Sequence, residues 1–498
     1  MFRWVAHMVW YTWFGIHGLV ILDDMDPFLI LLIGMLVVVG SILLLKLHPF
    51  LALVLGAVSV SLCITEVHLE QYAESKTKLT EEQRMELVES LNKKTTGERV
   101  AKGLGETAGK IGILIAMAAL IGKCLLETGA AERIVRSALG LLGEKRAPVA
   151  FMGSGFILGI PVYFDTVFYL MIPLAKSVAA KVGKNFGLYT MAIIAGATMA
   201  HSLVPPTPGP LLVASELDVD IGKMILGGLL LGSLTMITGY LYATWANRMF
   251  PIPLRDSADV TVAELKETSQ TKLSELPPLW LSLLPIVLPV ILIAGKTLVT
   301  EFVAEPNETM LALVKFWGDK NIALTLAALV ALGILIGRTR NLEAARESVQ
   351  KAISGAGMII LITSAGGAFG GVLQQTGIGP HIKEWASEYK ISLLPLAFFV
   401  TTLIRTAQGS ATVAMITSVG IFSGMVEDLG FDPLYLALAI GCGSKPFPWM
   451  NDSGFWVICK MSGMTEKETL KTSSTLMSLM ALSGLVILMI VASLFPNI

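Results

Sequence analysis

Charged side chains are scarce in this chain of 498 residues. They make up 15% of the sequence, whereas hydrophobic residues make up 54%. Soluble globular domains carry about a quarter charged residues, and the deficit here extends over nearly the whole length. Lys and Arg (37) balance Asp and Glu (38), and this absence of a basic surplus argues against a nucleic-acid partner. The composition therefore indicates a membrane protein rather than one large soluble core.

Cysteines and catalytic motifs are equally sparse. The four cysteines, Cys63, Cys124, Cys442 and Cys459, form no Cys-X-X-Cys pair and no metal-ligand spacing, which predicts simple apolar packing. No His/Asp/Glu cluster with metal spacing and no Gly-X-Ser-X-Gly sequence occurs. We therefore expect no metal, no cofactor and no catalytic residues, and a membrane-embedded enzyme is disfavoured.

Long apolar stretches occupy most of the chain. About 20 apolar residues cross a bilayer as a helix, and six clear candidates lie at residues 28–45, 49–64, 221–245, 281–299, 322–336 and 472–494. Gly, Pro or single polar residues interrupt six more, at 111–126, 148–174, 188–215, 358–373, 393–421 and 434–461. Broken segments at membrane depth must be shielded by protein or line a wet cavity. The pattern predicts an all-α polytopic membrane protein with about 11–14 membrane segments.

The organisation along the chain suggests two halves. We expect an extra hydrophobic segment at 1–27, a first half at 28–250, a polar linker at 251–278 and a second half at 279–498. The first half contains a polar insert at 66–107, in which residues 78–94 are typical of one solvated amphipathic helix.

A weak internal repeat supports this division. Residues 122–134 align without gaps with residues 370–382, sharing Gly, Leu, Thr-Gly and Ile. In each half an apolar segment with one lone charge follows, Asp165 first and Arg405 second, and then a Gly/Pro-rich interruption. Paired interrupted segments are typical of the substrate site of a secondary transporter and favour alternating access over a passive channel.

Two candidate groups lie in the first half. Asp165 follows Ile-Pro-Val-Tyr-Phe, and a bare carboxylate at the bilayer centre costs at least about 2.5–3.5 kcal/mol. It is either a buried tie between helices or a carrier of a cation or proton. His201 precedes four prolines within residues 205–210, which cannot continue a helix. The chain must unwind there, and His201 is either a structural hydrogen-bonding group or a proton carrier.

Two more candidate groups of polar residues lie in the second half, and the first of them surrounds Arg405. Arg405 precedes Gln408, Ser410 and Thr412; its planar fork matches a carboxylate, and the neutral groups suit hydroxyls. Pairing of Arg405 with Asp165 or Asp452 inside the protein is the alternative.

The last group is the run Asn451-Asp452-Ser453, which resembles a polar turn or helix cap between apolar segments. Lys445, just before it, could pair with Asp452 or end at the membrane interface.

These motifs resemble the gluconate permease family of bacterial symporters, within the wider ion transporter superfamily. The resemblance rests on Gly159-Ile-Pro-Val-Tyr-Phe-Asp165, on His201 with Pro205-Pro-Thr-Pro-Gly-Pro210, on Arg405-Thr-Ala-Gln-Gly-Ser-Ala-Thr412 and on Asn451-Asp-Ser-Gly-Phe-Trp456. It implies proton-coupled import of gluconate or a related sugar acid across the bacterial inner membrane. It also implies two inverted repeats with re-entrant hairpins, and superfamily relatives are often homodimers.

The chain departs from the family pattern at two positions. Thr207 stands where the family usually has His in Pro-Pro-His-Pro-Gly-Pro, and Pro448-Trp449-Met450 replaces a common Ser-His-Val. The substrate therefore need not be gluconate itself, and a proton route would depend on other groups.

The resulting hypothesis is a symporter for a small hydroxylated organic acid. Arg405 would bind the carboxylate, while neutral polar groups would meet the hydroxyls: Thr207, Gln408, Ser410, Thr412, Asn451 and Ser453. Asp165, His201 or Asp452 would carry the coupling cation, most simply a proton. The alternatives are a sodium-coupled carboxylate or amino-acid symporter and, less favoured, a passive channel.

Overall fold

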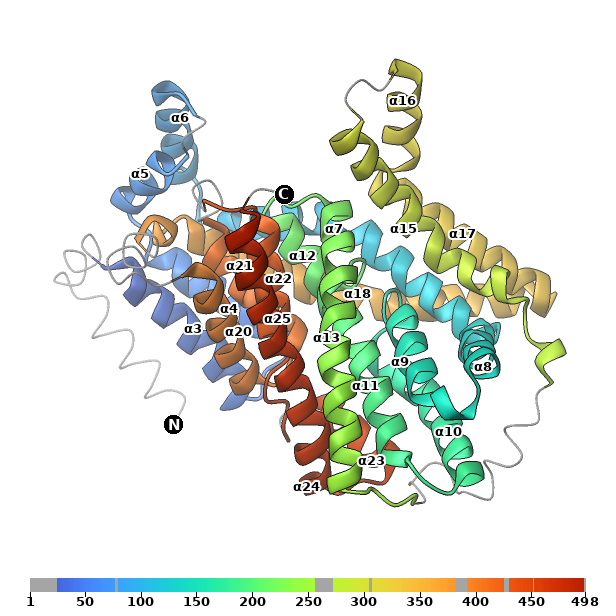
Figure 1. The fold of residues 1–498 in the computed structure, drawn as a ribbon. Helices are drawn as coiled ribbons and strands as arrows, with labels where there is room; N and C mark the ends of the chain where they lie inside the picture. Colours follow the sequence, from blue (N-terminus) through green and yellow to red (C-terminus); the bar gives the residue numbers. More distant parts are fainter. Residues whose placement is uncertain are drawn as a thin grey trace. The chain divides into compact units, whose positions relative to one another are not determined.

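The computed structural model describes residues 25–76, 79–255, 272–303, 307–381, 392–424, 430–450 and 452–496. Within these ranges the chain is almost entirely helical and contains no β-strand (Figure 1). The predicted all-α class is confirmed. Nearly all of the N-terminal segment 1–27, and most of the linker, lie outside the described residues.

The chain divides into two compact units. The first consists of residues 1–107, 364–391 and 420–429, and the second of residues 108–363, 392–419 and 430–498. The division passes through two long helices, α7 (Thr96–Glu127) and α18 (Leu342–Gln374), so each has one part in either unit.

The first unit pairs apolar with polar helices. Its elements besides parts of α7 and α18 are α3 (Pro27–Leu43), α4 (Pro49–Leu62), α5 (Glu66–Glu74) and α6 (Glu81–Asn92). The apolar helices α3 and α4 pack against each other. The polar helix α6 begins with reciprocal hydrogen bonds between Thr80 and Gln83. It lies within residues 78–94, where the sequence predicted a solvated helix, and that prediction is confirmed.

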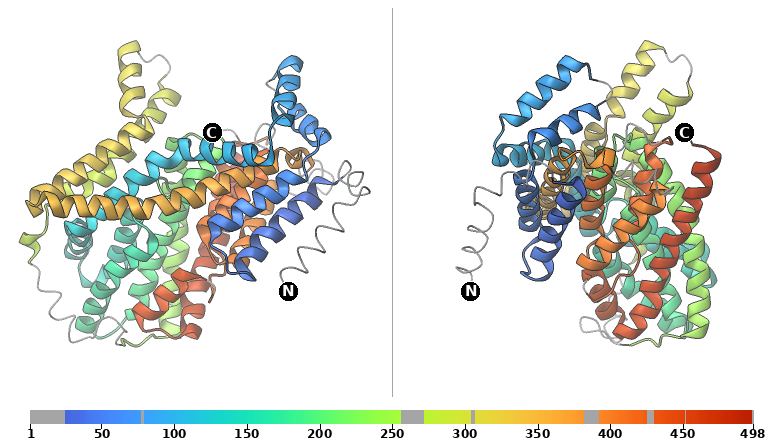
Figure 2. Two further views of the ribbon diagram at one scale, coloured as in Figure 1. Left: turned by 180° about the vertical axis from the view of Figure 1, so that it is seen from behind. Right: turned by 90° about the vertical axis from the view of Figure 1, so that its left-hand side faces the viewer.

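The second unit contains the remaining α-helices of the described ranges. They are α8 (Ala130–Leu142), α9 (Ala147–Leu158), α10 (Phe164–Val182), α11 (Phe186–Leu203), α12 (Pro208–Glu216), α13 (Ile221–Met249), α15 (Leu279–Phe302), α16 (Glu308–Trp317), α17 (Lys320–Thr339), α20 (Leu393–Gln408), α21 (Ala411–Phe422, with its end in the first unit), α22 (Pro433–Gly443), α23 (Ser453–Ser462), α24 (Glu466–Thr469) and α25 (Thr475–Leu494). Helix α25 lies beside α13 (Figures 1 and 2).

Helix α11 is the core of the second unit. Nearly all of its residues are buried, and it packs against α9 on one side and α13 on another. The contact with α9 depends on Gly196, where a Cβ atom would lie 2.0 Å from the carbonyl oxygen of Met152. Small residues permit such close approach between helices in membranes, where the lipid offers no hydrophobic drive for association.

Four of the six interrupted apolar segments are broken helices. The breaks separate α9 from α10, α11 from α12, α20 from α21 and α22 from α23. Helices α11 and α22 end just before the prolines within residues 205–210 and 446–448, because proline removes backbone donors. Gly409 ends α20 with φ at 81°, in the left-handed region that glycine tolerates.

The prediction of a break was wrong for residues 111–126 and 358–373. Both stretches belong to continuous helices, α7 of 32 residues and α18 of 33 residues. Their interruptions are glycines without proline, which a helix accommodates at a modest cost per residue. Gly122 permits a close approach of the neighbouring backbone, since a Cβ at this position would lie 3.1 Å from the Pro161 carbonyl oxygen.

The same order of elements occurs in both halves of the sequence. A long helix, α7 or α18, ends near a Thr-Gly pair whose glycine is left-handed, Gly129 with φ at 74° and Gly377 with φ at 72°. Two broken helices follow in each case. The inverted relation between the halves, the re-entrant hairpins and the domain boundaries stay predictions.

Seven helices within the described ranges are long and apolar enough to cross a membrane. They are 96–127, 186–216 counted through its break, 221–249, 279–300, 320–339, 342–374 and 466–494, and the bent pair α4–α5 would make an eighth. Shorter apolar helices α3, α20, α21 and α22 accompany them. The polytopic membrane class is thus confirmed, while the number of 11–14 segments stays a prediction.

Candidate functional site

The four helix breaks surround one cavity in the second unit. Its volume is about 290 Å³, near the lower end of the roughly 300–1,000 Å³ of small-molecule sites. Every lining residue belongs to the second unit: Tyr163, Phe164, Asp165, Thr198, His201, Pro208, Ile359, Ile362, Thr363, Arg405, Gly409, Ser410, Ala411, Thr412, Val413, Lys445, Asp452, Ser453, Gly454, Phe455, Ile458 and Met477. The structure therefore brings together segments that lie far apart in sequence, from Tyr163 to Met477, through the breaks that the sequence indicated.

The first turns of four helices line this cavity. Phe164 begins α10, Pro208 begins α12, Ala411 begins α21 and Ser453 begins α23. A helix N-terminus presents unpaired N–H groups and about half a positive charge, and α12 has fewer such donors than the other three because Pro208 and Pro210 lack an N–H. Ser410 and Asp452 accept one hydrogen bond each from the first turns of α21 and α23, leaving further donors there. Such an arrangement favours a small anion.

Arg405 lies in the last turn of α20 and is only 4% exposed. Its Nε donates to the Ser444 carbonyl at 3.0 Å, and its Nη2 forms an ion pair with Asp452. Its Nη1 has no hydrogen-bond partner among the described residues. The internal pairing considered from the sequence is therefore present, with Asp452 rather than Asp165, and one donor of the guanidinium remains.

The two carboxylates of the cavity flank Gly454. A Cβ at Gly454 would lie 3.0 Å from Asp452 Oδ1 and 3.6 Å from Asp165 Oδ1. Asp452 is held by Arg405 and by the Phe455 N–H at 3.0 Å. Asp165 has no ion pair within the described part of the chain, so it is the less constrained of the two.

His201 occupies the last turn of α11 and lines the same cavity. Its ring lies edge-on to Tyr163, with centroids 6.0 Å apart, and its Nδ1 has no hydrogen-bond partner among the described residues. All three residues predicted to carry the coupling cation, Asp165, His201 and Asp452, thus meet at one cavity.

The predicted substrate contacts are placed differently from one another. Ser410, Thr412 and Ser453 line the cavity together with Arg405. Gln408 is buried but not part of the lining, and Thr207 donates to the carbonyls of His201 at 2.9 Å and Val204 at 2.8 Å. Thr207 therefore caps the C-terminal end of α11. Asn451 lies outside the described residues.

Lys445 is the site residue whose place the sequence did not predict. It neither pairs with Asp452 nor reaches an interface; it is 5% exposed and lines the cavity. Its position in the Gly-Ser-Lys-Pro break indicated that Lys445 could lie near the site. The sequence could not show that Asp452 is already paired with Arg405. The apolar lining from α18, with Ile359 and Ile362, was also missed, because apolar side chains within an apolar segment give no local signal in the sequence.

The loop between α22 and α23 is anchored by neighbouring helices. Ser474 donates to the Pro448 carbonyl at 2.5 Å, and Ser478 accepts from the Phe447 N–H at 3.0 Å. Ser474 ends a π-helical turn, Leu470–Ser474, a feature often found at functional sites. Trp449 donates to the Thr406 carbonyl at 2.9 Å, away from the cavity lining.

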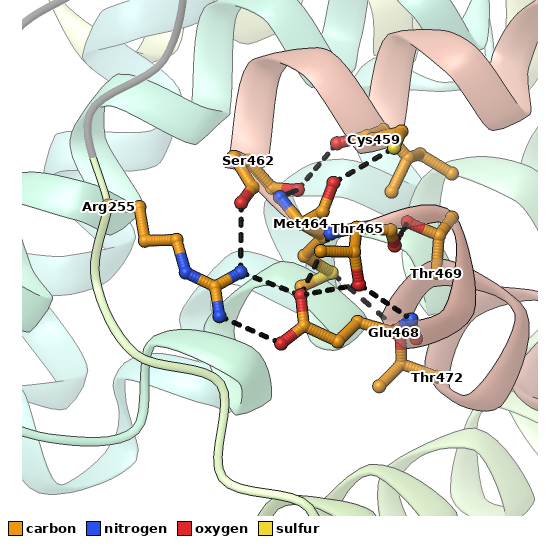
Figure 3. Close-up of polar contacts among 10 residues, drawn as sticks. Arg255, Cys459, Ser462, Met464, Thr465, Glu468, Thr469 and Thr472 are labelled. Atoms are coloured by element: carbon orange, nitrogen blue, oxygen red, sulfur yellow. Dashed lines mark hydrogen bonds and ion pairs between the residues drawn. The ribbon is translucent and has the colours of Figure 1, made fainter.

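A second anchor fixes the far end of α23. Arg255, just after α13, donates to both carboxylate oxygens of Glu468, at 2.7 and 2.9 Å, and to the Gly463 carbonyl at 3.1 Å (Figure 3). Glu468 also accepts from the Thr465 N–H at 2.8 Å. This bidentate contact ties the turn after α23 to the end of α13, and so supports the helix whose N-terminus lines the cavity.

Comparison with known proteins decides the family. The sequence model described as GntP family permease matches residues 83–495. This chain belongs to the GntP family of permeases. An uncharacterized permease of Haemophilus influenzae is 36% identical over 76% of this permease and 79% of its own length. The low-affinity gluconate transporter of Escherichia coli K12 is 32% identical, covering 78% and 86%, and a gluconate permease of Pseudomonas aeruginosa is 33% identical with the same coverage.

Solved structures agree on the fold. The YdaH transporter of Alcanivorax borkumensis has a TM-score of 0.56 and 15% identity, covering 79% of this permease and 88% of its own chain. MtrF of Neisseria gonorrhoeae has a TM-score of 0.58 and 17% identity, covering 79% and 82%. At such identities the likeness concerns the fold alone. The permease is a multi-pass protein of the bacterial inner membrane and a transport protein rather than an enzyme.

Proposed function

We propose that this permease imports gluconate or a related sugar acid together with a proton. The observation that carries the proposal is the single cavity at which four helix N-termini meet Arg405. Positive helix ends and a buried guanidinium suit a carboxylate. Relatives named gluconate transporters and permeases support a sugar acid as the source of that carboxylate.

In this proposal different polar groups of the lining bind the carboxylate and the hydroxyls of the substrate. The substrate carboxylate accepts from Arg405 Nη1 and from backbone N–H groups at the start of α21 or α23. Ser410, Thr412 and Ser453, which line the same cavity, bind the substrate hydroxyls. Gln408, Asn451 and Thr207 were predicted as further contacts and stay predictions.

Asp165 is the proposed carrier of the proton. Asp452 is engaged by Arg405, whereas Asp165 has no ion pair among the described residues and lies beside the same glycine. Protonation removes a negative charge that opposes the entry of an anion. His201 lies in the same lining and could relay the proton.

The direct test is uptake of radiolabelled gluconate into proteoliposomes under an inward proton gradient, with sodium replaced by choline. We expect accumulation that a protonophore abolishes. Accumulation that requires sodium and withstands the protonophore would replace the proton by sodium. Flow that never exceeds the outside concentration would indicate a channel, and absence of any flow by a folded preparation would contradict a sugar acid as substrate.

A variant separates coupling from binding. Asp165→Asn should retain exchange of labelled for unlabelled gluconate but lose accumulation driven by the proton gradient, because the amide cannot take up the proton. Asp218→Asn, at an exposed aspartate outside the lining, is the matched control and should retain both. Proton-driven accumulation by Asp165→Asn would exclude Asp165 as the carrier.

A further inference from the structure

Lys445 is a buried cation that the proposed recognition of the substrate does not use. It lies in the loop between α22 and α23, is 5% exposed, and lines the cavity. No hydrogen bond or ion pair joins its ammonium group to any described residue. A buried charge without a partner is unfavourable, so such a group either gives up its charge or faces a ligand or a counter-ion.

The carboxylates of the protein do not supply that counter-ion. Asp165 and Asp452 are the acidic residues of the described lining. Asp452 is committed to Arg405, and Asp165 forms no ion pair with Lys445. The residue before Lys445, Ser444, accepts the Arg405 Nε hydrogen bond, so the two cations enter the cavity from adjoining positions.

The charges of the lining then determine how much negative charge the cavity can hold. Counted in their ionised forms, Arg405 and Lys445 contribute one positive charge each and Asp165 and Asp452 one negative charge each, and all four line the cavity. His201 in its neutral form adds none. When Asp165 is protonated, one net positive charge remains. It resides on Lys445, since the charge of Arg405 is already balanced by Asp452. Inside a cavity of low dielectric, an unbalanced charge is costly in either direction.

We propose that Lys445 is a substrate-binding residue that balances the charge of the cargo and selects acids with a single negative charge. This inference rests on the proposed function and adds a recognition element to it. Arg405 then orients the carboxylate and holds the loop, whereas Lys445 supplies the net charge. A hydroxylated acid with two carboxylates would leave one negative charge unbalanced, and a neutral polyol derivative would leave the ammonium unpaired.

The test uses three ligands of nearly the same shape: gluconate with one negative charge, its neutral amide gluconamide, and the diacid glucarate. Titration calorimetry on the purified wild-type permease, at a pH that keeps Asp165 protonated in the complex, should give the lowest Kd for gluconate. Lys445→Gln should raise the Kd of gluconate by about ten- to a hundred-fold, the usual loss of a charged hydrogen bond. The Kd of gluconamide should change by less than about threefold, which also reports that the variant is folded.

Lys460→Gln is the matched control, because Lys460 is an exposed lysine on α23 outside the lining. It should leave the Kd of all three ligands unchanged. An unchanged ratio of gluconate to gluconamide binding in Lys445→Gln would overturn the role of Lys445. Wild-type binding of glucarate as tight as that of gluconate would overturn the selection for one charge, whether or not the variant folds. Wild-type binding of none of the three would instead contradict the proposed function, and the inference with it.

Discussion

At the scale of single residues, the buried pair of Arg405 and Asp452 has two separable roles. Arg405 holds the loop between α22 and α23 through Ser444 and Asp452, and its Nη1 is the donor assigned to the substrate. Removing one partner of a buried ion pair strands the other charge and costs about 3–5 kcal/mol. Loss of transport on mutation of Arg405 alone would therefore mix a folding defect with a binding defect.

A pair of variants separates the two roles. Arg405→Met should abolish gluconate uptake and lower the thermal unfolding temperature in detergent. Adding Asp452→Asn should recover much of the unfolding temperature, because no buried charge remains alone, without recovering uptake. Near-normal uptake by the double variant would remove Arg405 from substrate binding. A single variant as stable as wild type would show that the pair contributes little to folding.

The residues also show where sequence reasoning succeeds and fails. Proline runs and a lone arginine in an apolar segment predicted the breaks and the cavity residue Arg405, because both signals are local. Thr207 is predicted as a substrate contact, and the structure adds a second role, because its hydroxyl donates to the carbonyls freed by its own break. Its contact with substrate stays a prediction. The position of Lys445 depends on which carboxylate Arg405 engages, which only the three-dimensional arrangement determines.

At the scale of elements, the close contact between α9 and α11 positions two of the breaks. Gly196 should be replaceable by Ala only with displacement of α9, since the added methyl group would meet the Met152 carbonyl. We expect Gly196→Ala to lower stability by about 1–3 kcal/mol, as other overpacked cores do. Thermal unfolding of the purified permease measures this.

Gly153 provides the control on the partner helix. It also lies within α9, but a Cβ there would meet nothing within 4 Å. Gly153→Ala should leave stability unchanged or raise it slightly, by up to about 1 kcal/mol, through helix propensity. Equal effects of the two substitutions on stability would mean that the effect of Gly196→Ala comes from backbone freedom rather than from the α9–α11 contact.

The elements also explain the error on α7 and α18. Glycine interrupts an apolar run in the sequence as proline does, yet glycine keeps its N–H and only adds flexibility. In a membrane the bilayer removes water as a competitor for the backbone groups, so a glycine-rich segment remains helical. The sequence therefore predicts the break at the proline run 205–210, whereas single prolines leave α10 and α15 continuous, at Pro173 and at Pro285 and Pro289. The break at Gly409 is evident only from its left-handed conformation in the structure.

At the scale of the whole molecule, the charge balance of the cavity predicts how transport responds to a membrane potential. One acid anion moving with one proton carries no net charge. An imposed pH gradient should therefore drive gluconate accumulation in proteoliposomes, whereas a potassium diffusion potential alone should not. Uptake driven by the potential alone would show that more than one proton, or another cation, moves with each anion.

The four helix N-termini have a consequence for any mutational survey of this permease. Their N–H groups belong to the backbone, so they persist after any substitution except proline, although α12 lacks them at Pro208 and Pro210. Replacing Ala411 or Gly454 one by one would alter the shape of the cavity, but would leave the donors themselves in place. An alanine scan would consequently record the side chains around the anion and pass over much of what attracts it. Backbone amide-to-ester replacement, which deletes one N–H at a time, is the kind of chemistry that would detect it.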